Sequence, residues 1–177
     1  LVTLNAKTII YSQWGRFYHD NISTFKLQKP SSLQNQPVKW LIADWRDARP
    51  MTQPGMFLIP KEIIEKSGLW NENLSLIDDF EYYTRIILSS ERIVFSPNTT
   101  LYYRSGNSGV LSAQKSRKAV ESAFLSLQLG TAKLLSLENS ALSRLCSANM
   151  WQGFVYEYFY SQPDLAKKAE QKIKELG

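Results

Sequence analysis

Two adjacent carboxylates, Asp78 and Asp79, open a helical pattern near the middle of the chain. Phe80, Tyr83 and Ile87 follow at steps of three and four, which places them on one stripe of a predicted helix. Acidic residues in a first turn interact favourably with the positive end of the helix dipole, by about 0.3–1 kcal/mol. A structural helix start is therefore one interpretation of the pair.

The second interpretation is proton transfer by one of the two aspartates. A carboxylate becomes a better general base near neutral pH when burial or a neighbouring negative charge raises its pKa. Asp78, Asp79 and the nearby Glu81 supply such like charges within four consecutive residues. The sequence thus leaves two roles open, a helix cap and a general base.

The segments on either side of this helix predict an α/β arrangement. Residues 55–60 form a short apolar run that ends at a proline, and residues 61–66 read as a short helix that ends at Gly68. Residues 92–97 and 101–104 are two further strand-like runs. Strands and helices in this alternation predict a sheet with helices packed on it.

Seven features of this region occur in a fixed order along the chain. They are Gly55, the turn Gly-Leu-Trp-Asn-Glu at 68–72, the Asp78-Asp79 pair, Glu81, Arg85, the strand-like run 93–95 and Tyr103-Arg104. With these features, residues 1–112 resemble the C-terminal, acceptor-side half of the family 2 glycosyltransferases. Those are inverting enzymes of the GT-A fold that use sugar nucleotides.

The resemblance implies a fold, a reaction and a set of residues. It implies a partial GT-A-like sheet with flanking helices over residues 1–112, followed by a helical tail over 113–177. A sugar would pass from a nucleotide-sugar donor to a glycan or lipid-linked acceptor. Asp79 matches the position of the general base, and Asp78 is the alternative base or orients the acceptor. The expected substrate contacts are Trp45, Thr52, Gly55, Glu81 and Arg104.

The resemblance also implies a divalent metal, Mg or Mn, in the full-length enzyme, and this chain departs from the family there. The family holds its metal with an Asp-x-Asp pair that offsets the charge of the diphosphate. No two aspartates of this sequence have that spacing; they are Asp20, Asp44, Asp47, Asp78, Asp79 and Asp164. We therefore expect no metal ligands here, and no turnover of a sugar nucleotide by this chain alone.

Two of the expected substrate contacts have a structural alternative. Residues 38–47 include Trp40 and Trp45 among charged residues, a mixture typical of sugar sites but also of an amphipathic helix that buries both indoles. Arg104 could contact the diphosphate or form a structural salt bridge. Both alternatives stay open at this point.

The composition of the chain limits the classes of protein to which it can belong. The chain has 177 residues, of which 44% are hydrophobic, enough for one folded domain with a sizeable core. The net charge of +5 is spread out and carries no nucleic-acid motif. No apolar run is long enough for a transmembrane helix, so we expect a cytoplasmic protein, with membrane association and homo-oligomers left open. The only cysteine, Cys146, lies on an apolar helical stripe and is expected to be buried.

Functions outside catalysis remain as alternatives. The chain could be a non-catalytic module that binds carbohydrate or a protein through Trp40, Trp45 and the helical tail. It could also be a helical cap that mediates oligomers. The tail, three predicted helices from Ser112 onward, is expected to lay its apolar faces on the sheet or on another chain.

Overall fold

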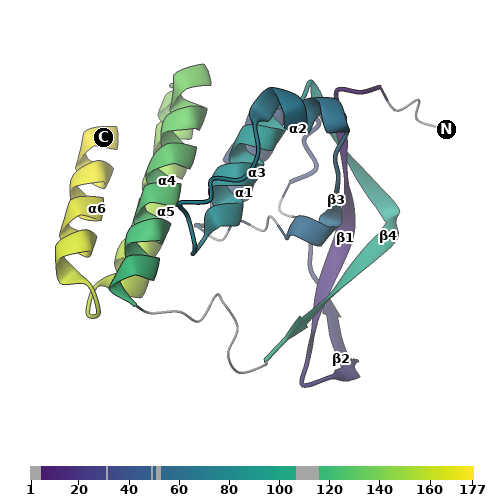
Figure 1. The fold of residues 1–177 in the computed structure, drawn as a ribbon, viewed down its shortest axis with the longest axis horizontal. Coiled ribbons are helices and arrows are strands. Elements are labelled where there is room, and N and C mark those ends of the chain that lie inside the picture. The colour runs from purple at the N-terminus through teal and green to yellow at the C-terminus, as the bar shows by residue number, and fades with distance from the viewer. Residues whose placement is uncertain (1–4, 31, 49, 51–52, 107–115) are drawn as a thin grey trace.

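A computed structural model describes residues 5–30, 32–48, 50, 53–106 and 116–177. Figure 1 shows a twisted sheet at one end of the molecule, with the helices stacked beside it in successive layers. In chain order the elements are β1 (Thr8–Tyr18), β2 (Asn21–Leu27), α1 (Pro37–Trp45), the 3₁₀ turn η1 (Pro54–Met56), β3 (Phe57–Leu58), α2 (Lys61–Ser67), α3 (Asp78–Ser89), β4 (Arg92–Ser105), α4 (Arg117–Leu137), α5 (Ala141–Tyr158) and α6 (Pro163–Leu176). The α/β class expected from the sequence is confirmed.

β1 is the central strand of the four-stranded sheet. β4 runs parallel to it along its whole length, so β2 and β3, both antiparallel to β1, share the opposite edge. The pairing of β1 with β4 slips between Ser12 and Gln13, whose partners are Ser96 and Thr100. Residues 97–99 are left out of register there because Pro97 cannot donate to a ladder. The two runs expected at 92–97 and 101–104 are therefore one strand divided by this irregularity.

The strand expected at 55–60 is shorter than predicted. Gly55 belongs to η1, and only Phe57 and Leu58 pair with β1. Leu58 is mostly exposed, so this run is not the buried strand that its composition suggested. The ring of Phe57 instead stacks on Tyr83 of α3 at 4.9 Å, which ties the sheet edge to the acidic helix.

Helix α1 begins at Pro37, whose missing N–H is no loss at a first helical position. It buries Trp40 and Trp45, and Trp40 packs edge-on against Tyr11 of β1 at 5.5 Å. The amphipathic-helix interpretation of residues 38–47 is thus the one that the structure shows.

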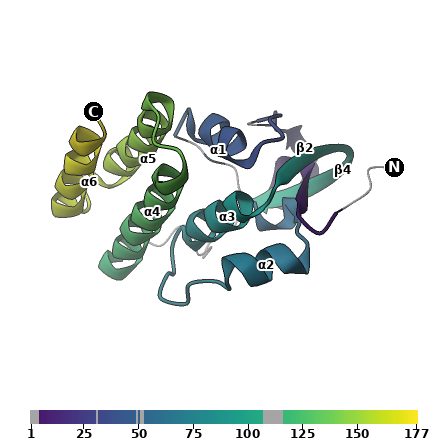
Figure 2. The ribbon, with the colours of Figure 1, turned by 90° about the horizontal axis from the view of Figure 1, so that it is seen from above.

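The tail does not lie on the sheet. Helix α4 packs against α3, α5 packs against α1, and α6 packs against α5, which adds further helical layers (Figure 2). Cys146 is buried in α5, as its position on an apolar stripe predicted. The sheet therefore supports α1 and α3, and the tail supports those two helices from the other side.

Helices α3 and α4 approach closely at Gly130. A Cβ atom there would lie 2.5 Å from Cε1 of Phe80. The Phe80 ring cannot retreat easily, because the buried indole of Trp45 packs against it at 4.8 Å between ring centroids. The close contact requires a residue without a side chain at this position.

We predict that Gly130→Ala lowers the free energy of unfolding. Overpacking of a core costs about 1–3 kcal/mol, more than the ~1 kcal/mol that alanine gains over glycine in a helix. Gly153→Ala is the matched control, since its Cβ would come no closer than 3.4 Å to any atom outside its own helix. Denaturant unfolding of both variants checks this; equal stabilisation by the two substitutions would contradict the packing.

Candidate active site

The acidic helix α3 begins after a strained residue. Ile77 occupies the N-cap position with φ 58° and ψ 26°, in the left-handed region. A β-branched side chain is a genuine outlier there, and such a conformation costs about 1–3 kcal/mol unless its surroundings enforce it. The backbone changes direction at Ile77, and Asp78 and Asp79 follow directly as the first two residues of α3.

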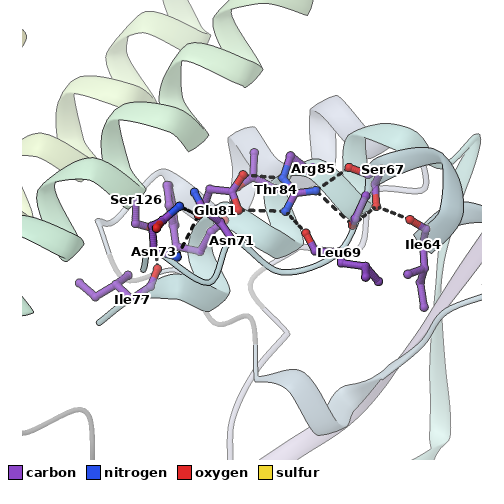
Figure 3. Close-up of polar contacts among 12 residues, drawn as sticks. Ile64, Ser67, Leu69, Asn71, Asn73, Ile77, Glu81, Thr84, Arg85 and Ser126 are labelled. Atoms are coloured by element: carbon purple, nitrogen blue, oxygen red, sulfur yellow. Dashed lines mark hydrogen bonds and ion pairs between the residues drawn. The ribbon is translucent and has the colours of Figure 1, made fainter. Parts of the chain in front are cut away.

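Two serines of α4 hold this turn in place. The hydroxyl of Ser122 accepts hydrogen bonds from the backbone N–H groups of Ser75 and Leu76, at 2.7 and 3.1 Å. The hydroxyl of Ser126 donates to the carbonyl of Ile77, as drawn in Figure 3. Both serines are buried, one helical turn apart. Neither serine was predicted as part of the site; the available signal was their place among small residues at helical spacing, Ala119, Ala123 and Gly130.

Asp79 is the acid with the perturbed environment. Its carboxylate accepts the backbone N–H of Phe80 at 2.9 Å. Burial raises the pKa of Asp79 above its ordinary value, and the charge of Asp78 raises it further, against an opposing effect of the backbone hydrogen bonds. The backbone contact fits a structural carboxylate in the first turn of a helix, whereas the raised pKa fits a general base. The two roles are compatible in one carboxylate.

Tyr83 lies on the next turn of α3 and is electrostatically linked to Asp79. Burial, followed by Tyr82 and Asp79, raises the pKa of Tyr83 to about 12. Its hydroxyl donates to the carbonyl of Pro54 at 3.3 Å. Tyr83 therefore stays protonated and joins the acidic helix to η1.

Glu81 has a different role from the expected substrate contact. Its side chain is only 7% exposed, and both carboxylate oxygens bind Arg85, one turn later on the same helix (Figure 3). The ion pair and the low exposure of the Glu81 carboxylate together leave little of it accessible to a sugar hydroxyl. Glu81 therefore lies in a structural ion pair at the position where a substrate contact was expected.

Arg85 extends this ion pair to the loop between α2 and α3. Its guanidinium donates to the carbonyls of Ser67, Gly68 and Leu69, the last two at 3.2 and 2.9 Å (Figure 3). These carbonyls lie at or just beyond the end of α2, where intrahelical partners run out. The pair Glu81–Arg85 thus fixes the loop to the second turn of α3.

Trp45 is also corrected. Its side chain is 0% exposed and packs against Phe80, so a sugar ring cannot stack on it. Thr52, the neighbouring expected contact, lies outside the described residues. The one expected substrate contact on α1, Trp45, therefore belongs to the core.

Gly55 and Arg104 lie apart, Gly55 in η1 and Arg104 near the end of β4. Gly55 lines an open groove of ≈ 520 Å³ together with hydroxyl-bearing residues of β1 and β4. Arg104 forms a salt bridge with Asp20 at 2.9 Å between exposed side chains. Arg104 pairs with Phe17 of β1, six residues beyond the Tyr11–Phe57 pair, which is about 20 Å along a strand. The structure therefore shows the salt-bridge alternative for Arg104 and does not bring it to Asp79.

Within the described part of the chain, no group of three or more His, Cys, Asp or Glu side chains is placed to hold a metal ion. Within the same residues, no helix combines the length and hydropathy needed to cross a bilayer. Comparison with protein-family models, with curated proteins and with solved structures gave no match.

We predict that Asp79→Asn stabilises the folded chain at neutral pH. A carboxyl whose folded pKa is raised binds its proton more tightly in the folded state, so ionisation favours unfolding. The stability of the variant relative to the parent should rise as pH increases from below 3.8 to the raised folded pKa, and stay constant above it. Thermal unfolding across this pH range measures the difference.

Asp164→Asn supplies a control of opposite sign. Arg117 lowers the pKa of Asp164 to about 2, so ionisation of this carboxyl favours folding. The stability that it contributes is present above the ordinary carboxyl pKa and is lost as pH falls toward 2. Parallel pH profiles for the two variants would contradict the environment assigned to Asp79.

We predict that Glu81→Gln destabilises the chain by about 2–3 kcal/mol, because it leaves the half-buried charge of Arg85 without a counter-ion. Glu65→Gln is the matched control: Glu65 pairs with Lys61 at 3.0 Å, also one turn apart, but both side chains are exposed. Its loss should change stability by no more than about 0.5 kcal/mol. Chemical denaturation distinguishes the two, and similar small effects would show that the Glu81–Arg85 pair is not a structural anchor.

Proposed function

We propose that this chain is the acceptor-side portion of an inverting glycosyltransferase with a GT-A-like fold, and that Asp79 is its general base. The single observation that carries the proposal is the partly buried Asp79 carboxyl, whose pKa is raised, at the start of α3. The strained turn at Ile77, held by serines of α4, supports it, since strain of this kind clusters at functional sites.

In the proposed reaction an acceptor hydroxyl attacks the anomeric carbon of a nucleotide-sugar. The new bond forms between the acceptor oxygen and that carbon, and the carbon–oxygen bond to the diphosphate breaks, with its electron pair leaving on the diphosphate. The acceptor proton passes to the Asp79 carboxylate. Burial and the adjacent Asp78 favour this step, because they stabilise the protonated product of the transfer.

The remaining elements of the proposal lie outside these residues. The donor-binding half and the Mg or Mn ion belong to the complete enzyme, and the described residues offer no ligand set for the metal. No step of the reaction is therefore assigned to a metal here. The acceptor would be a glycan or a lipid-linked saccharide.

The second candidate is a non-catalytic module that binds carbohydrate or a protein. The position of Asp79 in the first turn of α3, beside backbone N–H groups, favours it, because a carboxylate there stabilises a helix without any catalytic role. The two candidates differ in whether loss of the Asp79 charge abolishes chemistry or leaves function intact.

We predict that Asp79→Asn reduces glycosyl transfer by about 10²–10⁴-fold in the protein encoded by the complete reading frame that contains these residues. Asparagine keeps the size and the acceptor for the Phe80 N–H but cannot take up a proton. The measurement is the rate of product formation at saturating donor and acceptor. Asp20→Asn, which removes an exposed carboxyl of the β1–β2 turn, is the control and should leave the rate unchanged.

The companion variant Asp78→Asn assigns the base between the two acids. Retained transfer in Asp79→Asn with loss in Asp78→Asn would move the base to Asp78. Full transfer in both variants would contradict base catalysis by either aspartate and leave the binding module as the better account.

A further inference from the structure

Trp70 differs from every other tryptophan of the chain in its exposure. The sequence contains five tryptophans. Four are buried in the core and at most 4% exposed; they are Trp14, Trp40, Trp45 and Trp151. Trp70, in the loop between α2 and α3, is 39% exposed. A large aromatic surface therefore reaches solvent at one tryptophan only.

The ring of Trp70 is held in a fixed orientation. It stacks on Tyr82 with a centroid separation of 4.1 Å and an interplanar angle of 11°, and it meets Tyr83 edge-on at 6.1 Å. The neighbouring backbone is held as well, because the guanidinium of Arg85 donates to the carbonyl of Leu69 at 2.9 Å. A ring fixed in this way loses little conformational entropy when a ligand stacks on it.

Trp70 lies close to the proposed base. Its two aromatic partners, Tyr82 and Tyr83, follow Asp79 by three and four residues, so they occupy the next turn of α3, about 5 Å along the axis. Residues three and four positions apart on a helix share one face, so Tyr82 and Tyr83 lie on the same side of α3 as Asp79. Trp70, which contacts both tyrosines, therefore lies on the side of α3 that carries Asp79.

The chemistry around Trp70 suits a sugar. A pyranose ring has an apolar face of C–H groups that packs on an aromatic ring, and hydroxyls at its rim that bind amides and carboxylates. Glu72 and Asn73, both exposed, supply such groups in the same loop, next to Trp70. The loop also presents Leu69 with its side chain largely exposed. Apolar and polar contacts are therefore available on one short segment.

We propose that Trp70 binds a pyranose unit of the acceptor by stacking and positions it toward Asp79. This inference rests on the proposed function, since it names the residue that recognises the acceptor of that same site. It replaces Trp45, which is buried, as the aromatic contact. The Glu81–Arg85 pair then acts indirectly, because it fixes the loop that carries Trp70.

Tryptophan fluorescence tests this binding on the 177-residue chain itself. The probes are the methyl glycosides of glucose, galactose, mannose and N-acetylglucosamine, with glycerol as a hydroxyl-bearing control that has no ring. We expect at least one glycoside to change the emission, because only Trp70 is open to it, and glycerol to change nothing. No response to any of the four glycosides in the folded chain would overturn the proposal.

Variants identify the residue responsible. Trp70→Ala should weaken glycoside binding, measured by ligand-observed NMR, by about 3- to 10-fold, and Trp70→Phe should retain most of it. Tyr156→Ala is the control, because Tyr156 is an 87% exposed aromatic residue on α5, which packs against α1, α4 and α6. Equal losses in Trp70→Ala and Tyr156→Ala would contradict a site at Trp70.

The transfer assay separates this inference from the proposed function. In the protein from the complete reading frame, Trp70→Ala should raise the KM for the acceptor and leave the KM for the donor unchanged. Loss of transfer in Asp79→Asn with an unchanged acceptor KM in Trp70→Ala would overturn only the inference about Trp70. Glycoside binding that depends on Trp70, with full transfer in Asp79→Asn, would retain Trp70 and reject the proposed base.

Discussion

The ion pair between Glu81 and Arg85 is the interaction on which the surroundings of the candidate site depend. Arg85, held by Glu81, donates to three consecutive carbonyls at the end of α2 and just beyond it. A side chain of α3 thus supplies hydrogen-bond donors to carbonyls that have no backbone N–H partner within α2. A buried pair is costly to desolvate and gives no assurance of stability by itself. Its effect here is to determine where the α2–α3 loop lies, and with it the ring of Trp70.

The start of α3 is determined from the opposite side, by the helical tail. Ser122 and Ser126 of α4 bind the backbone of residues 75–77, and Gly130 of the same helix gives Phe80 the room to pack. The tail is therefore part of the construction of the site, although it lies apart from the sheet. Helix α3 is thus held by an ion pair on its second turn and by serines that bind the residues just before its start.

Local patterns predicted some of this arrangement well. The spacing of Phe80, Tyr83 and Ile87 predicted α3 and its buried stripe, and all three side chains are buried. The i,i+4 relation of Glu81 and Arg85 could also be read from the sequence. Its consequence could not, because the carbonyls that Arg85 binds belong to a loop whose position is set by tertiary packing.

Other features have no local signal at all. Ile77 adopts a left-handed conformation that its β-branched side chain disfavours, so propensity predicts the opposite of what the surrounding contacts enforce. Trp45 and Trp70 have the same side chain, and each stands in a short segment that mixes apolar and polar residues. Their exposure differs because of the packing around them. Trp45 is buried because α1 packs against both α3 and α5, whereas Trp70 lies in the α2–α3 loop at the surface. Exposure is a property of the packed chain, which is why the sequence did not distinguish the buried tryptophan from the exposed one.

The environment of Asp79 combines two opposing demands. Backbone N–H groups at a helix start stabilise a carboxylate and lower its pKa, whereas burial and the adjacent Asp78 raise it, and the second effect is the larger. A purely structural cap would gain from being fully charged and well solvated. An acid that the fold keeps near Asp78 and partly away from water, at a strained turn, makes the folded state less stable at neutral pH than it could be. Such a conflict between stability and local arrangement is what a site that must accept a proton requires.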